Sequence, residues 1–241
     1  MQVGVDTGGT FTDVVAGDGR IVKMPSTPAD PAEAVRLGLS QLGGDRPALL
    51  AHGTTVATNA LLERQGATVA LVTTVGLADV VEIARQDRPS LYDQWADRPE
   101  PLVPRDLRLE VGGRLAATGA EVEPVPLEAV PDVPAGAAAV AVCLLHADLD
   151  PSHERAVAGV LAGRGHEVVC SHEVSPEFRE YERAVTTLVD ASLRPVCRSY
   201  LTRLAPLADE VLVMTSAGGL VSLDEALERP AALLLSGPAG G

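Results

Sequence analysis

The sequence predicts an α/β protein whose mixed sheet opens with an antiparallel hairpin. Short apolar runs, which are typical of buried strands, alternate along the chain with segments of helical periodicity. Such alternation favours a mixed or largely parallel sheet. The first apolar run differs from the others, because two glycines and a second strand-like run follow it directly. This order predicts a hairpin at the start of the sheet.

Turn and capping signals locate the elements in order. The hairpin strands are expected around residues 3–5 and 11–15, and the Gly-Asp-Gly turn at 17–19 leads into a third antiparallel strand at 20–24. Further strands are expected at 49–51, 69–73, 107–111, 138–145, 168–170 and 211–214, and an apolar run at 232–235 ends the series. Helices are expected at 31–42, from 57 to the glycine at 66, at 79–84 and at 151–161, and the longest opens at 175–177.

The chain length of 241 residues suits one large domain or two small ones. We expect one domain over residues 1–235, in which 89–134 form a proline-rich extended excursion. Residues 236–241 are expected to begin a following catalytic domain that is truncated here.

Composition limits the class of protein. The net charge of −14 argues against a nucleic-acid or an anionic-membrane partner. The three cysteines are widely spaced without a CxxC pair, so buried free thiols are expected. No signal-peptide pattern and no membrane-length apolar run occurs. A soluble cytoplasmic protein is the expectation.

The first hairpin carries the parts of a phosphate site. Asp6 stands where the first strand ends, and the turn that follows has no side chains at Gly8 and Gly9, so backbone N–H groups can approach an anion. Hydroxyl groups that can donate to phosphate oxygens are present at Thr7, Thr10 and Thr12. Asp6 can hold a divalent cation. A plain tight turn is the alternative, and the second carboxylate at Asp13 favours the functional interpretation.

Two better-known phosphate motifs are excluded. A P-loop needs Gly-Lys-Ser/Thr, and Lys23 is the only lysine of the chain. A Rossmann turn leads into a helix, whereas this turn leads into a second strand.

Four loops repeat one pattern, in which an apolar run ends in glycine with Ser, Thr or His. They lie at residues 6–13, 52–55, 216–219 and 236–241. Ligands gather at strand ends of α/β sheets, so four such loops together indicate a ligand site.

These residues resemble the N-terminal region of the hydantoinase A/5-oxoprolinase family, which includes ketone carboxylase relatives. The specific motifs are Val-Asp-Thr-Gly-Gly-Thr-Phe-Thr-Asp-Val at 5–14 and His-Gly-Thr-Thr-Val-Ala-Thr-Asn at 52–59. Supporting matches are Arg-Gln-Asp-Arg-Pro at 85–89, Pro-Glu-Phe-Arg-Glu-Tyr-Glu-Arg at 176–183 and Leu-Leu-Ser-Gly-Pro-Ala-Gly at 234–240. The resemblance covers essentially the whole chain, in order.

The resemblance implies an actin-like ATPase fold, as in sugar kinases and heat-shock 70 chaperones. It implies ATP and Mg²⁺ (or Mn²⁺) as cofactors, and ATP-dependent opening of a cyclic amide of the 5-oxoproline or hydantoin type. Asp6 then corresponds to the metal-side carboxylate, and Asp13 either assists the metal or caps the turn. The residues expected to bind the nucleotide are Gly8, Gly9, Thr10, Thr12, Ser236 and Gly237.

Two interpretations are possible for most of the remaining candidate site residues. His52 either supports catalysis or makes a structural hydrogen bond. Thr54 and Thr55 are expected substrate contacts, or one of them caps the helix that follows. Asn59 in the same motif is a further substrate contact. Arg85 binds a substrate carboxylate or forms an exposed salt bridge.

Family members are typically far longer than this chain. We therefore expect this chain to be an N-terminal fragment, a truncated product or one subunit of a split enzyme. Its expected partner is the rest of the enzyme or a partner subunit, and an oligomer is the expected assembly. Lactams, imides and ketones are the expected substrates. The alternatives are a ketone carboxylase subunit, an acetate- or sugar-kinase relative, and an inactive structural or regulatory fragment.

Overall fold

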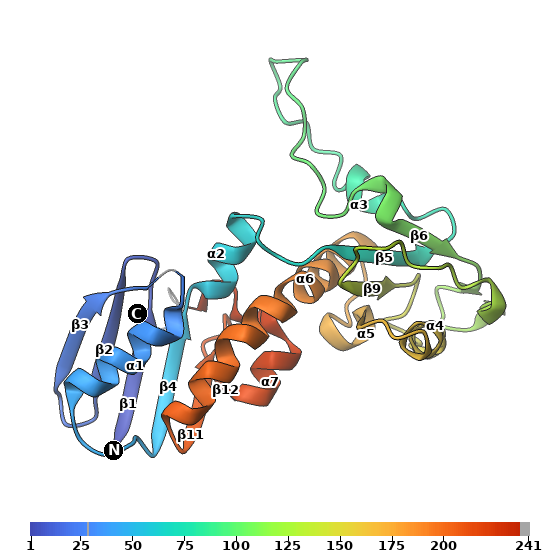
Figure 1. The fold of residues 1–241 in the computed structure, drawn as a ribbon. Coiled ribbons are helices and arrows are strands. Elements are labelled where there is room, and N and C mark those ends of the chain that lie inside the picture. The colour runs from blue at the N-terminus through green and yellow to red at the C-terminus, as the bar shows by residue number, and fades with distance from the viewer. Residues whose placement is uncertain (28, 237–241) are drawn as a thin grey trace. The chain divides into compact units, whose positions relative to one another are not determined.

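The computed structural model describes residues 1–27 and 29–236, which form two compact units (Figure 1). Unit 1 comprises Met1–Gly66 and Leu193–Gly241, and unit 2 comprises Ala67–Ser192. The chain therefore leaves unit 1 after its first helices and returns to it later. Each unit has a sheet of its own.

Unit 1 contains a mixed six-stranded sheet in the order β12-β11-β4-β1-β2-β3. Its strands are β1 (Gln2–Thr7), β2 (Phe11–Ala16), β3 (Ile21–Pro25), β4 (Leu49–Thr54), β11 (Glu210–Met214) and β12 (Leu220–Ser222). β1 pairs antiparallel with β2 and parallel with β4, so the expected hairpin and the parallel strands share one sheet. This confirms the predicted mixed sheet.

Alternation along β1 separates the two faces of this sheet. Val3 and Val5 are buried together with Thr7, while Asp6 points to the opposite, more exposed face. Helix α1 (Pro31–Leu42) packs on the buried face, where a Cβ at Gly38 would lie 2.5 Å from Val14 Cγ2. Glycine at position 38 therefore lets the helix approach the hairpin closely. The other helical segments of unit 1 are α2 (Val56–Leu62), η3 (Ala205–Leu207), α7 (Leu223–Glu228) and η4 (Pro230–Leu233).

Unit 2 contains a parallel four-stranded sheet in the order β10-β9-β5-β6. Its strands are β5 (Val69–Thr74), β6 (Arg108–Val111), β9 (Ala139–Cys143) and β10 (Val168–Cys170). Every residue of β5 and β9 is buried, which matches the apolar sequence of β9 and of the first four residues of β5. The other elements are α3 (Val80–Ile83), η1 (Arg105–Leu107), the hairpin β7 (Arg114–Leu115) and β8 (Glu121–Glu123), η2 (Leu127–Ala129), α4 (Ser152–Gly163) and α5 (Ser171–Val174).

The longest helix, α6 (Glu180–Leu204), runs from unit 2 into unit 1. The sequence predicts its start at 175–177, but the helix begins at Glu180. Arg179 has φ +87°, which is incompatible with a right-handed helix and ends the helical stretch on that side. Residues 171–174 instead form the short helix α5.

Two further differences concern the C-terminal part. The apolar run at 232–235 is not a strand, because residues 230–233 form the 3₁₀ turn η4. Proline at its first position favours a helical φ and lacks the N–H that a strand ladder needs. The strand β12 was not expected, and it pairs with β11 through the turn at 216–219.

Cys143, Cys170 and Cys197 are buried free thiols, as predicted. Among the described residues, no helix combines the length and the apolar character needed to cross a membrane.

Candidate functional site

The turn between β1 and β2 presents backbone donors. The Gly8 N–H closes the turn by donating to the Phe11 carbonyl over 3.0 Å, and a Cβ at Gly8 would lie 3.2 Å from that same oxygen. The N–H groups of Gly9 and Thr10 have no hydrogen-bond acceptor among the described residues. Two successive N–H groups without internal partners form a concave site suited to an anion.

A row of charged groups lies beside this turn on the exposed face of the sheet. Strand register places Asp6 opposite Asp13 and Asp13 opposite Lys23. Lys23 Nζ donates to both carboxylate oxygens of Asp13, at 3.0 and 3.1 Å. Asp13 is thus neutralised by the chain's single lysine, and Asp6 is the carboxylate of this row that remains for a cation.

The environment of Asp6 fits a metal-binding carboxylate. Partial burial, and next the neighbouring Asp13, raise the pKa of Asp6, while Lys23 lowers it. A Cβ at Gly53 would lie only 3.2 Å from Asp6 Oδ1. Glycine in the His-Gly-Thr-Thr motif therefore leaves room for this carboxylate.

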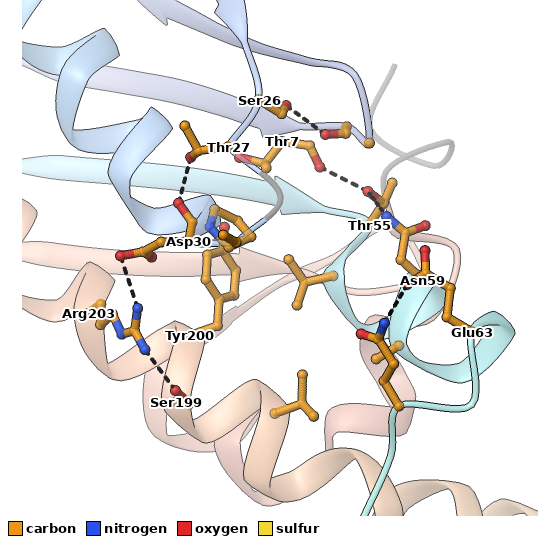
Figure 2. A pocket seen from close by; sticks show the side chains of 18 of the residues that line it. Thr7, Ser26, Thr27, Asp30, Thr55, Asn59, Glu63, Ser199, Tyr200 and Arg203 are labelled. Carbon is orange, nitrogen blue, oxygen red and sulfur yellow. Dashed lines mark hydrogen bonds and ion pairs between the residues drawn. The ribbon is translucent and has the colours of Figure 1, made fainter.

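The opposite side of the turn borders a pocket of about 490 Å³ in unit 1 (Figure 2). Its walls come from the hairpin turn, the start of α1, helix α2 and the second half of α6. The polar groups around it include Thr7, Ser26, Thr27, Asp30, Thr55, Asn59, Tyr200 and Arg203. The turn therefore separates a carboxylate-lined face from a hydroxyl- and amide-lined pocket.

Internal bonds hold several pocket groups in place. Thr55 Oγ1 donates to the Thr7 carbonyl at 3.2 Å and accepts from the Asn59 amide at 3.4 Å. Arg203 pairs with Asp30 at 3.0 Å. The hydroxyl of Thr7 is buried and has no hydrogen-bond partner among the described residues, although this residue lines the pocket. An unpartnered buried hydroxyl is costly, so a polar ligand atom here would satisfy it.

The predicted hydroxyls are therefore not all on one side. Thr12 is fully buried and its hydroxyl shares a hydrogen bond with Ser26 at 3.0 Å, while Thr10 is exposed at the turn. Thr54 is buried, and its hydroxyl accepts from the Val56 N–H at the start of α2, whereas Thr55 occupies the N-cap position without a side-chain capping bond. Of the four expected substrate contacts, the structure brings Thr55 and Asn59 to the pocket wall.

His52 lies in the interior of unit 1. Its Nε2 is 2.5 Å from the Tyr200 hydroxyl, and the two rings are tilted against each other. Burial lowers the pKa of His52 to about 4 and raises the pKa of Tyr200 to about 12. Both groups are neutral at ordinary pH. His52 touches the pocket only through Tyr200, which favours its structural interpretation.

Ser236 lies near the same strand end, where its hydroxyl donates to the Thr54 carbonyl at 3.1 Å. Gly237, the other expected nucleotide contact of that loop, lies outside the described residues.

Arg85 belongs to unit 2, where its guanidinium pairs with Glu182 at the surface. This is the salt-bridge alternative for Arg85.

Unit 2 also holds a buried polar cluster at the ends of β9 and β10. The Glu154 carboxylate accepts from the N–H of Leu144, the Ser171 hydroxyl, and both the N–H and Nδ1 of His172. Arg183 fills the space beside it and pairs with Asp148 at 2.9 Å. All of these groups are engaged with one another, so the cluster resembles a structural network more than a ligand site.

Three contributors to the site were missed from the sequence: Lys23, Gly53 and Tyr200. The single lysine and the glycine after His52 are visible signals, but their meaning depends on strand register. Tyr200 carries no local signal, because it meets His52 across 148 residues of chain.

Comparison with known proteins assigns the family. The hydantoinase/oxoprolinase N-terminal region matches residues 2–165, and the hydantoinase/oxoprolinase domain that follows it matches residues 183–241. This chain, with its mixed α/β fold and its glycine turn beside an acidic strand end, therefore belongs to the hydantoinase/oxoprolinase family.

Named relatives agree with this assignment. Caprolactamase subunit alpha of Pseudomonas jessenii is 38% identical over 99% of this chain, and 5-oxoprolinase 1 of Arabidopsis thaliana is 32% identical over 98%. The crystal structure of the Pseudomonas jessenii ATP-dependent caprolactamase superposes with a TM-score of 0.87 at 35% identity, over 99% of this chain. A nucleotide-free acetone carboxylase, which carries out ATP-dependent acetone carboxylation, superposes over 100% of this chain with a TM-score of 0.85 at 25% identity.

This chain is much shorter than the relatives that it matches. This chain spans 38% of the caprolactamase subunit, 22% of the plant 5-oxoprolinase, and 39% of each of the two structural neighbours. The structural likeness confirms the predicted fold, which is consistent with an actin-like lobe.

Proposed function

We propose that this chain supplies the phosphate-binding part of an ATP-dependent enzyme that opens a cyclic amide of the lactam or imide type. The observation that carries the proposal is the β1–β2 turn, where the unpartnered N–H groups of Gly9 and Thr10 lie beside the Asp6 carboxylate. The names of the caprolactamase and 5-oxoprolinase relatives support the substrate class.

The chemistry explains why ATP is needed. An amide carbonyl is a weak electrophile, and transfer of a phosphoryl group to its oxygen makes that oxygen a good leaving group. Phosphoryl transfer relies on positioning and on neutralising charge, more than on covalent help from the protein. Mg²⁺ or Mn²⁺ would neutralise phosphate charge when bound.

The residues of this chain divide that work. Asp6 holds the cation, and Gly9 and Thr10 donate N–H groups to phosphate oxygens. Gly8 keeps the turn tight, and Lys23 keeps Asp13 from competing for the cation. The pocket beside Thr55 and Asn59 is large enough for a small ring and offers it hydrogen bonds. Thr12, Thr54, His52 and Ser236 support the turn and the strand ends around it.

Complete activity requires polypeptide beyond this chain. A phosphate chain gripped by one turn lacks donors on its other side, and transfer needs both sides held. We place the enzyme in the cytoplasm, since it uses ATP and its cysteines are free thiols.

The test is Asp6→Asn in the complete enzyme. Loss of one charge at the metal site should lower substrate-dependent ATP hydrolysis by about 100-fold or more, without loss of folding. Asp18→Asn is the matched control, since Asp18 lies in the turn after β2 and its ion pair is with exposed Arg20. Unchanged turnover and unchanged Mg²⁺ dependence in Asp6→Asn would exclude the assigned role.

A second candidate is ATP-dependent ketone carboxylation, which the likeness to acetone carboxylase favours. A substrate panel separates the two functions. Stimulation of ATP hydrolysis by 5-oxoproline, hydantoin or caprolactam supports amide opening, whereas stimulation by ketones with bicarbonate supports carboxylation. A free phosphorylated product would instead indicate a kinase, and no stimulation by any of them would indicate a regulatory chain.

A further inference from the structure

The pocket beside the β1–β2 turn is negatively charged. Among the described residues that line it, three carry charge: Asp30 at the start of α1, Glu63 at the end of α2, and Arg203 of α6. Two carboxylates against one guanidinium leave one net negative charge, within a chain whose net charge is −14. The pocket therefore repels a small anion that approaches from solvent.

The single guanidinium of the pocket is already engaged. Arg203 Nη1 pairs with Asp30 Oδ2 at 3.0 Å, and Arg203 Nη2 donates to the Ser199 hydroxyl at 3.1 Å (Figure 2). A substrate carboxylate would have to displace Asp30 from Arg203, or lie beside Asp30 without a cation of its own. Both arrangements are unfavourable, because they bring like charges together.

The start of α1 does not compensate for this charge. A helix N-terminus attracts anions through its free N–H groups. The first position of α1 is Pro31, which has no N–H, and the N–H groups of Glu33 and Ala34 donate to the Asp30 carbonyl at 3.0 Å and to the Thr27 hydroxyl at 3.1 Å. The Asp30 carboxylate itself stands at this helix end, where it already interacts with the helix dipole.

Helix α2 also begins at this pocket, and its first donors are used within unit 1. The N–H of Thr55 donates to the Thr7 carbonyl at 3.1 Å, and the N–H of Val56 donates to the Thr54 hydroxyl at 3.2 Å. The donors of the β1–β2 turn are assigned to phosphate in the proposed function. None of these groups is then left for a substrate carboxylate.

The remaining wall suits a ring of methylene groups. It is formed by Val56, Ala60, Pro195 and Val196, together with the ring of Tyr200. Apolar side chains with a few polar groups are typical of a pocket that binds a neutral small molecule.

We propose that this pocket selects neutral cyclic amides and discriminates against cyclic amides that carry a carboxylate, and that Asp30, Glu63 and Arg203 set this selectivity. The inference rests on the proposed function and narrows its substrate class. Phosphate bound at the neighbouring turn adds negative charge beside the pocket, which strengthens the discrimination.

The test compares three five-membered lactams as substrates of the complete enzyme, with ATP hydrolysis as the readout. 5-Oxoproline and 5-oxoprolinamide are similar in size and differ in charge, and 2-pyrrolidinone lacks the substituent altogether. The kcat/KM for 5-oxoprolinamide should exceed that for 5-oxoproline by about tenfold or more, because the carboxylate meets like charge in the pocket. 2-Pyrrolidinone should also be preferred over 5-oxoproline.

Two variants change the charge of the pocket. Asp30→Asn keeps the shape of the side chain, removes one carboxylate and releases Arg203, so it should reduce the preference for 5-oxoprolinamide over 5-oxoproline by about tenfold. Glu63→Gln should change the preference in the same direction but by less, because Glu63 is exposed and its charge is screened. Asp209→Asn is the matched control, since it breaks an exposed pair with Arg46 outside the pocket and should leave the preference unchanged.

The outcomes separate this inference from the proposed function. Equal use of 5-oxoproline and 5-oxoprolinamide, or a preference for 5-oxoproline, would overturn the charge selection and leave amide opening in place. An unchanged preference in both Asp30→Asn and Glu63→Gln would also overturn it. Absence of stimulated ATP hydrolysis with all three lactams and with caprolactam would overturn the proposed function, and this inference with it.

Discussion

The two sheets of this protein treat polar groups at their strand ends in opposite ways. In unit 1, the turn after β1 leaves the N–H groups of Gly9 and Thr10 without an acceptor in the described part of the chain, and a pocket adjoins it. In unit 2, Glu154 of α4 and Arg183 of α6 lie at the ends of β9 and β10, where both are buried and hydrogen-bonded.

This difference separates binding from stability. Donors without internal partners keep their capacity for a ligand, whereas a saturated network has none left and stabilises the fold instead. Arg183 of the family motif at 176–183 thus belongs to the architecture of unit 2, and the small uncharged turn residues belong to the proposed site. Charge density alone is a poor guide to function in this chain.

The largest expected effect concerns the buried hydrogen-bond network around Glu154 and Arg183 in unit 2. Arg183→Met should destabilise unit 2 by about 3–5 kcal/mol, because it removes the ion-pair partner of Asp148 and one of the two donors to the Leu144 carbonyl. Hydrogen exchange at the amides of β9 and β10 measures the loss. Arg85→Met removes an exposed pair with Glu182 and should leave the stability of unit 2 nearly unchanged, because solvent screens the pair. Equal losses in the two variants would contradict the structural role of the network.

The second prediction concerns the buried histidine of unit 1. The folded-state pKa of His52 is about 4, below its ordinary value of 6.5, so at lower pH the unfolded chain binds a proton that the folded chain does not. Stability is therefore retained above pH 6.5 and lost as the pH falls towards 4. Between pH 7 and pH 5 this group should remove about 2 kcal/mol. Urea unfolding of the chain and of His52→Gln at both pH values measures the difference. A variant with the same pH dependence as the parent would show that His52 is not held neutral.

The smallest expected effect concerns the β1–β2 turn of unit 1 and tests the role of Asp6 there. Gly53→Ala places a methyl group 3.2 Å from Asp6 Oδ1 and displaces that carboxylate by a few tenths of an ångström. Mg²⁺-dependent ATP hydrolysis by the complete enzyme should fall by up to about tenfold, with little change in stability. Gly4→Ala is the matched control on β1, since its Cβ would lie 4.0 Å from the nearest atom. Similar activities in both variants would contradict the role of Asp6 in Mg²⁺-dependent ATP hydrolysis.

Much of the fold could be predicted from local signals. The hairpin, α1 and the buried strands β5 and β9 follow from apolar runs bounded by glycine, proline and capping residues. Errors occur where a local pattern has two solutions. The run at 232–235 is apolar enough for a strand, and the proline at 230 together with the packing of unit 1 decides for a 3₁₀ turn. The start of α6 depends on the left-handed backbone of Arg179, which no composition signal announces.

The sequence by itself determined the turn: two glycines after an acidic strand end, followed by a second strand, can fold in few other ways. It also determined that the core is aliphatic and that no lysine other than Lys23 is available to the site. Only the tertiary structure decided which groups meet. The alternation of β1 and its register with β2 and β3 set Asp6 beside a neutralised Asp13, and turn Thr7 to the pocket. Tyr200 reaches His52 because the second half of α6 belongs to unit 1. Contacts between distant segments depend on packing and register, which no short stretch of residues contains.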